Sequence, residues 1–216
     1  MEIYSRSMTV TKPVIVLLCM NLNMVLGCSF WSPPMNIWLS HDVLSIPQQR
    51  FSDHIILQKE VDDRRGAPDR IGHRYTLCLL PDIGGGVYAI DPVGIEIVRQ
   101  VKEALESVGY HVTLTDVPYS DPLPAKLLKI QINELYFKNC GLHFFTWGNI
   151  SLTLTLTSHE GKVLFVATAQ EDGQSMLGGF MEWRGFTEAV KKSLTGVLNQ
   201  IVTASSTEEF RQALKR

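Results

Sequence analysis

Residues 150–157 read Ile-Ser-Leu-Thr-Leu-Thr-Leu-Thr, and this stretch decides the fold. Apolar and hydroxyl side chains alternate without error, which is typical of a strand with one buried and one exposed face. Antiparallel sheets commonly pack one face on the core and expose the other face to solvent. The stretch therefore predicts a sheet that is covered by helices on one side only.

Two further strands are predicted next to this stretch. Before it, apolar residues occupy every second position from Leu128 to Ile132, but the next one is Leu135. The alternation slips by one residue near 133–134, and a β-bulge is the simplest account. After it, a short turn leads to a strand over 162–171. These three strands are expected to form an antiparallel meander.

Helices and two more strands complete the predicted domain. Asp91 and Pro92 supply a helix start, apolar residues recur at helical spacing up to Val108, and Gly109 ends the run. Strands are expected over 75–80 and 110–115, a helix over about 190–201, and a short helix after a capping box at 206–209. The order β-α-β-β-β-α-α predicts an α+β fold with two layers, a mainly antiparallel sheet of about five strands and helices on one face.

Composition and charge exclude several classes of protein. The chain has 216 residues, 20 basic and 22 acidic, with a formal charge of -2, so no basic footprint for nucleic acid is present. The four cysteines include no C-x-x-C pair, and the six histidines are at least 13 residues apart, so neither pattern indicates a metal site. A Gly84–Gly86 loop before a helix resembles a dinucleotide fingerprint, but the helix begins too late at Asp91–Pro92. We expect no metal, no cofactor and no catalytic residue.

The amino terminus is expected to be an export signal. An apolar run of about 13 residues follows Pro13, which is too short to cross a bilayer and typical of a signal peptide. The chain starts at either Met1 or Met8. The run ends in Val25-Leu26-Gly27-Cys28, which resembles the lipobox of bacterial lipoproteins, although Leu26 is bulkier than usual. That resemblance implies that Cys28 is lipidated and attaches the protein to a membrane. Ser29 after the cysteine implies sorting to the outer membrane.

Three segments follow from these patterns. Residues 1–27 are the expected signal peptide, 28–73 a lipidated cysteine with a tether, and 74–216 a periplasmic α+β domain. The segment from 29 to about 72 shows no sustained period and contains a charged run, as a tether would. Its apolar residues are too many for a pure spacer, so part of it is expected to pack on the domain or on a partner.

Two cysteines remain in the expected domain, Cys78 and Cys140. In an oxidising compartment they either form a disulfide or lie buried as inert thiols. A remote alternative is that one of them is the nucleophile of an envelope thiol enzyme, which would need a thiol that is exposed and has a low pKa.

Aromatic residues gather near the ends of the predicted strands. If the three strands form a meander, all of these aromatics fall at one end of the sheet. Either they cap the core, or they form an apolar patch that contacts a partner protein or the membrane surface. The residues concerned are Phe144, Phe145, Trp147, Phe180 and Trp183.

The chain from Ile95 to its end resembles the YajG-like uncharacterised lipoproteins of Gram-negative envelopes. The similar segments are 95–112, 127–136, 150–157 and 206–214. The resemblance implies a non-enzymatic, lipid-anchored protein on the periplasmic face of the outer membrane. Such a protein would bind or scaffold another envelope component, expected to be a protein. A second candidate is an auxiliary subunit of a lipid or lipopolysaccharide transport system.

Overall fold

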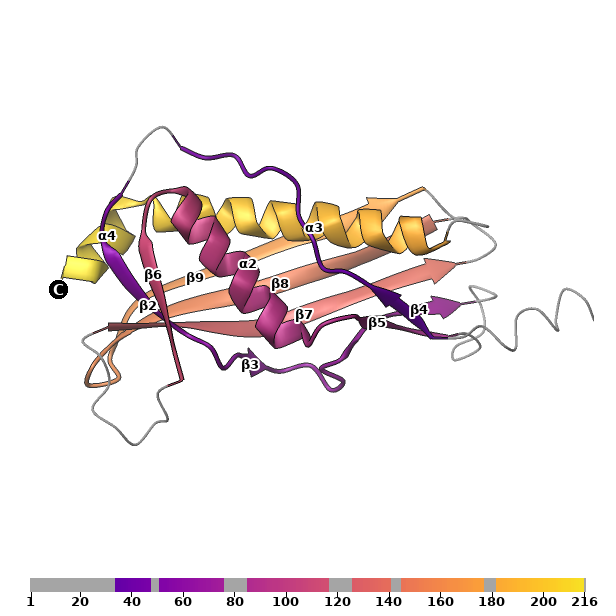
Figure 1. Cartoon of the computed structure of the whole chain (residues 1–216), viewed down its shortest axis with the longest axis horizontal. Helices are drawn as coiled ribbons and strands as arrows, with labels where there is room; N and C mark the ends of the chain where they lie inside the picture. The colour runs from indigo at the N-terminus through magenta and orange to yellow at the C-terminus, as the bar shows by residue number, and fades with distance from the viewer. Residues whose placement is uncertain are drawn as a thin grey trace, which may run out of the picture.

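The computed structural model describes residues 34–47, 51–75, 85–116, 126–140, 145–176 and 182–215, and these form one α+β fold (Figure 1). The strands are β1 (Met35–Ile37), β2 (His54–Gln58), β3 (Asp62–Asp63), β4 (Arg70–Tyr75), β5 (Gly86–Ala89), β6 (His111–Thr115), β7 (Lys126–Cys140), β8 (Phe145–Ser158) and β9 (Val163–Ser175). The helices are α2 (Val93–Ser107), α3 (Glu182–Ser205) and α4 (Glu208–Lys215).

The meander of β7, β8 and β9 forms the centre of the sheet. Both pairs are antiparallel, and the register of β7 against β8 shifts between Ile132 and Glu134, so the predicted bulge is confirmed. β7 has 15 residues and at about 3.3 Å per residue spans roughly 50 Å. The face that contains Leu152 and Leu154 is buried, whereas Thr153 and Thr155 on the other face are partly exposed.

The expectation of about five strands is wrong, because the sheet has nine. Four of the additional strands, β1 to β4, come from the segment that the sequence assigned to a tether. β2, β3 and β4 pair with the second edge of β7, all of them parallel to it. β3 has only two residues, and β2 and β4 do not alternate apolar and polar residues, so none of them shows the pattern that reveals a strand in sequence. The expected strand over 75–80 lies almost wholly outside the described residues.

The helices are arranged differently from the simple layer that the sequence predicted. α3 runs along β8 and β9, whereas α2 crosses obliquely and packs on α3 and β6 (Figure 1). α4 contacts β9, and the ring of Phe210 meets that of Phe165 edge-on with centroids 5.0 Å apart. The core therefore lies between the meander and two crossing helices.

Two of the predicted helix boundaries need correction. α2 begins after Pro92 without a side-chain cap, so Asp91 does not cap it. At α4 the oxygen of Thr207, rather than that of Ser206, accepts a hydrogen bond from the backbone N–H of Phe210. The end of α2 is as predicted, because Gly109 follows it with a φ of 103°, a conformation that favours glycine.

Part of the predicted tether crosses the helical layer before entering β2. The backbone N–H of Asp42 donates to Thr195, and that of Ser45 donates to Asn199, both on α3. Lys191 of α3 also forms an ion pair with Asp42. Residues 41–45 are therefore bound along α3.

Candidate functional site

The predicted aromatic patch is split between the two sides of the sheet. Phe145 and Trp147 lie within β8 rather than at a hairpin tip, and Trp183 lies in the first turn of α3. Phe144 and Phe180 are outside the described residues, as are Cys28 and Cys78. Cys140 ends β7, but its side chain is also outside the described part. The structure therefore brings Phe145 and Trp147 together and leaves Trp183 on the helical side.

A groove of about 880 Å³ lies on the uncovered face of the meander, at the end where β8 begins. Ligand sites in proteins commonly have volumes of about 300–1,000 Å³. The residues that line the groove come from all three long strands: Glu134, Tyr136 and Lys138 of β7, Phe145, Trp147, Gly148 and Asn149 of β8, and Asp172, Gly173 and Gln174 of β9.

Strand geometry places these side chains in rows across the sheet. Trp147 has Lys138 as its partner on β7 and Gln174 as its partner on β9. In the next outward-facing row, Asn149 lies between Tyr136 and Asp172. Directly opposed residues have Cβ atoms about 4.5–5.5 Å apart, so each row is a continuous line of contacts.

Short contacts orient several of these groups. The rings of Phe145 and Trp147 have centroids 5.7 Å apart and are tilted by 30°. The side-chain amide of Asn149 donates a hydrogen bond of 2.7 Å to a carboxylate oxygen of Asp172. Trp147 nevertheless keeps 40% of its surface exposed, so the ring is available to a ligand.

Glycines allow other groups to approach closely behind the groove. Gly148 and Gly173 are partners across β8 and β9 and belong to the face that carries the helix. A Cβ on Gly148 would collide with the carbonyl oxygen of Tyr136, and one on Gly173 with that of Ala189 in α3. The missing side chain at Gly173 lets α3 pack tightly against the sheet, and the one at Gly148 leaves room for the ring of Phe137.

Trp183 is the other exposed aromatic of the predicted patch. It is 53% exposed, and the guanidinium of Arg184 lies 5.1 Å from its ring centroid. α3 packs on the face opposite the groove, and Trp183 is not among the residues that line the groove. Trp183 thus serves as a natural control for experiments on Trp147.

Most of the polar residues of the groove carry no signal in the sequence. Tyr136, Lys138, Asn149 and Asp172 belong to no recognisable motif. The outward positions of the alternating strands already marked them as exposed. What was missing was the register that places them side by side.

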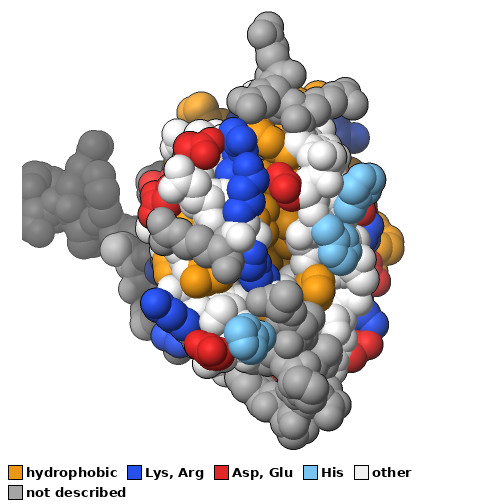
Figure 2. Space-filling model, turned by 90° about the vertical axis from the view of Figure 1, so that its left-hand side faces the viewer, with side chains coloured by type: hydrophobic (Ala, Val, Ile, Leu, Met, Phe, Trp, Pro, Cys, Tyr) orange, Lys and Arg blue, Asp and Glu red, His pale blue; other side chains and the backbone are white. Residues whose placement is uncertain are grey.

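The end of the molecule opposite the groove faces the viewer in Figure 2. Lys and Arg side chains form a column there, next to acidic and histidine side chains. At this end Arg211 forms an ion pair of 2.8 Å with Glu208, and Lys126 donates to the backbone carbonyl of Leu214. These two cations therefore support the packing of α4.

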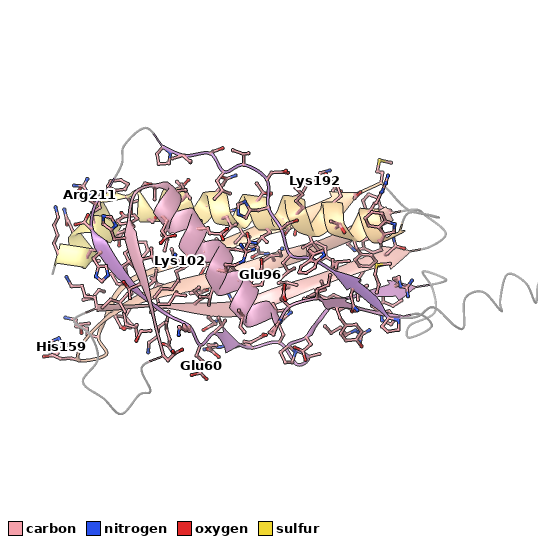
Figure 3. All side chains as sticks on the ribbon, viewed as in Figure 1. Glu60, Glu96, Lys102, His159, Lys192 and Arg211 are labelled. Atoms are coloured by element: carbon pink, nitrogen blue, oxygen red, sulfur yellow. The ribbon has the colours of Figure 1, made fainter. Side chains whose placement is uncertain are left out.

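Buried charges outside the groove have structural partners. Glu96 on α2 accepts hydrogen bonds from Arg99 and Gln100 (Figure 3). Burial alone would raise the pKa of Glu96, but these bonds and the positive charge of Arg99 outweigh it and hold the pKa below its ordinary 4.5. Burial raises the pKa of Tyr110 to about 12, and its hydroxyl donates to the carbonyl of Ser205. Both groups are held by the core and lie away from the groove.

Metal-ligand clusters and membrane-spanning helices are both absent from the described part of the chain. In that part of the chain, no three His, Cys, Asp or Glu side chains lie close enough together to hold a metal ion. Within the same residues, none of the helices combines the length and the apolar character that crossing a membrane requires.

No protein-family model matches the chain, and a comparison with curated proteins finds no match. Among solved structures, protein XCC0632 from Xanthomonas campestris (family model DUF330) superposes with a TM-score of 0.61 at 14% identity, over 84% of this chain and 100% of that one. The PelC dodecamer protein from Paraburkholderia phytofirmans gives 0.41 at 13% identity, over 73% and 92%. Lipoprotein GNA1162 from Neisseria meningitidis gives 0.27 at 14% identity, over 70% and 99%.

The fold and the groove define a class: an α+β domain whose described helices lie on one face of the sheet and leave the groove, with its aromatic rings, on the other. Within that class, the chain shares its fold with XCC0632 of Xanthomonas campestris. At 14% identity the likeness extends to the fold alone.

Proposed function

We propose that this protein is a non-enzymatic module of the bacterial cell envelope, anchored by a lipid on Cys28. It binds another envelope component through the groove on the open face of β7, β8 and β9. The observation that carries the proposal is the exposed ring of Trp147 in a groove that no described helix covers. The lipobox at 25–28 and the resemblance to the YajG-like lipoproteins favour the periplasmic face of the outer membrane.

The groove lies at the end from which the chain enters the fold. Cross-strand partners form one row through the sheet, Met35–Val87–Gly72–Phe137–Gly148–Gly173. Strands are about 4.8 Å apart, so three spacings place Met35 roughly 15 Å from Phe137. β1 runs opposite to β7, so the chain enters β1 from the end at which β7 finishes.

The chain between the lipid and the fold is short. Six residues lie between Cys28 and Met35, and the seven steps of an extended chain that join them reach at most about 25 Å. A lipid on Cys28 would therefore hold the groove near the membrane surface. The groove could then reach envelope components that lie at the membrane surface.

Metabolic labelling with a fatty acid tests the anchor. We expect the wild-type protein to be labelled and Cys28→Ala to lose the label, because the thiol is the acylated group. Cys19→Ala, within the predicted signal, is the matched control and should be labelled as the wild type is. Equal labelling of wild type and Cys28→Ala would overturn the proposed anchor.

Site-specific photo-crosslinking in intact cells tests the groove. A photoreactive residue in place of Trp147 is expected to give crosslinked products, because this ring lies in the proposed binding surface. The control position is Glu160, in the exposed turn at the far end of β8 and β9. Equal crosslinking at the two positions would contradict a role for the groove.

A further inference from the structure

The groove combines an exposed ring with planar hydrogen-bonding groups. Trp147 presents its ring between Lys138 and Gln174, and Phe145 supports that ring from the same strand. One row further along, the carboxylate of Asp172 and the amide of Asn149 lie side by side. A ligand in this groove would meet an apolar surface and, beside it, both donors and acceptors.

The charges of the groove argue against an anionic ligand. Glu134 and Asp172 contribute two negative charges, and Lys138 contributes one positive charge. The ammonium of Lys138 lies 5.7 Å from the centre of the Tyr136 ring, which already engages it in a cation–π contact. A phosphate or an acidic polymer would therefore meet net repulsion.

The same lining is unsuited to a purely apolar ligand. A hydrocarbon chain over the groove would remove water from Glu134, Asn149, Asp172 and Gln174 without replacing its hydrogen bonds. Burial is unfavourable for each polar group that is left unpaired. The ligand must therefore offer hydroxyl or amide groups as well as an apolar face.

We propose that the groove binds a neutral saccharide, with one sugar ring stacked on Trp147 and its hydroxyl groups bonded to Asn149, Asp172 and Gln174. A sugar ring has C–H groups on one face and hydroxyl groups around its rim, which matches this lining. Side-chain carboxylates and amides accept from and donate to such hydroxyls. The proposal rests on the groove being the binding surface of the proposed function, and it is independent of the lipid on Cys28.

Calorimetry on the full-length protein in detergent micelles tests this inference. The soluble probes are hexamers of glucose and of N-acetylglucosamine. Mixed micelles that contain a neutral glycolipid, compared with mixed micelles that contain phosphatidylcholine, show whether a lipid-linked sugar is bound instead. We expect at least one sugar probe to bind, with affinity lowered tenfold or more in Trp147→Ala and largely kept in Trp147→Phe.

Trp183→Ala is the matched control and should bind as the wild type does, because Trp183 lies on the helical side. Asp172→Asn keeps the shape of the side chain and should weaken binding less than Trp147→Ala. The inference is overturned if no sugar probe binds the wild type, or if Trp147→Ala and Trp183→Ala bind equally. Neither result affects the labelling of Cys28, so the anchor and the saccharide site can fail separately.

Discussion

At the scale of single residues, Arg99 on α2 pairs with two glutamates in different surroundings. Glu96 is buried and also bonded to Gln100, whereas Glu103 is exposed. We expect Glu96→Gln to lower the free energy of unfolding by about 1–3 kcal/mol at neutral pH, because a charged acceptor for two donors is lost. Glu103→Gln, the matched control, should cost no more than about 1 kcal/mol. Chemical denaturation measures both.

The pKa of Glu96 adds a pH dependence to this prediction. Because the folded-state pKa is lowered from 4.5, the unfolded chain binds the proton more readily. The stabilisation is complete above the unfolded value and is lost as the pH falls through the folded one. The wild type should therefore lose stability below about pH 4.5 more steeply than Glu96→Gln. Parallel curves for the two proteins would contradict this assignment.

At the scale of elements, β9 forms an edge of the sheet and pairs only with β8 among the described strands. Gln200 of α3 covers part of that edge, because its side chain accepts from the backbone N–H of Gln170 at 3.0 Å and donates to its carbonyl at 2.8 Å. Exposed strand edges promote aggregation. Gln200→Leu should therefore lower the free energy of unfolding by about 1–2 kcal/mol and speed the formation of thioflavin-positive aggregates.

The control for the edge of β9 is Gln212→Leu. Gln212 is exposed on α4, and its side-chain amide donates a hydrogen bond of 3.4 Å to Glu208. This variant adds the same apolar side chain without exposing a strand. Similar aggregation rates for the two variants would show that surface hydrophobicity, rather than the uncovered edge, is responsible.

At the scale of the whole molecule, the amino-terminal strands are part of the core. A chain that starts at residue 74 lacks β1 to β3 and most of β4, together with the buried Ile55, Leu57 and Ile71. Burying three such side chains contributes roughly 5–9 kcal/mol, which is comparable to the stability of a typical domain. We expect this chain to lack a cooperative unfolding transition and a near-ultraviolet circular dichroism signal.

A chain that starts at residue 34 keeps every described strand and is the matched control. It should unfold cooperatively in denaturant, because no described element is removed. If the chain from residue 74 unfolded with the same midpoint, the first four strands would be dispensable to the core.

Long periodic segments could be predicted from sequence, and short ones could not. The meander, its bulge at 132–134 and the helix that ends at Gly109 all show patterns over many residues. β1 and β3 have three and two residues, which carry no measurable alternation. Their place in the sheet depends on parallel pairing with distant strands, and such pairing leaves no trace in local sequence.

The groove likewise contains residues that the sequence predicts and residues that only the structure reveals. Phe145 and Trp147 could be proposed from their composition, but Tyr136, Asn149 and Asp172 became candidates only once the register was known. The α+β class and the periodic elements follow from the sequence alone, because each depends on neighbouring residues, and the lipid site at Cys28 stays a prediction from sequence. The tertiary structure decided the nine-stranded sheet, the side of the sheet to which each aromatic belongs and the existence of the groove. These features depend on contacts between residues that are far apart in the chain.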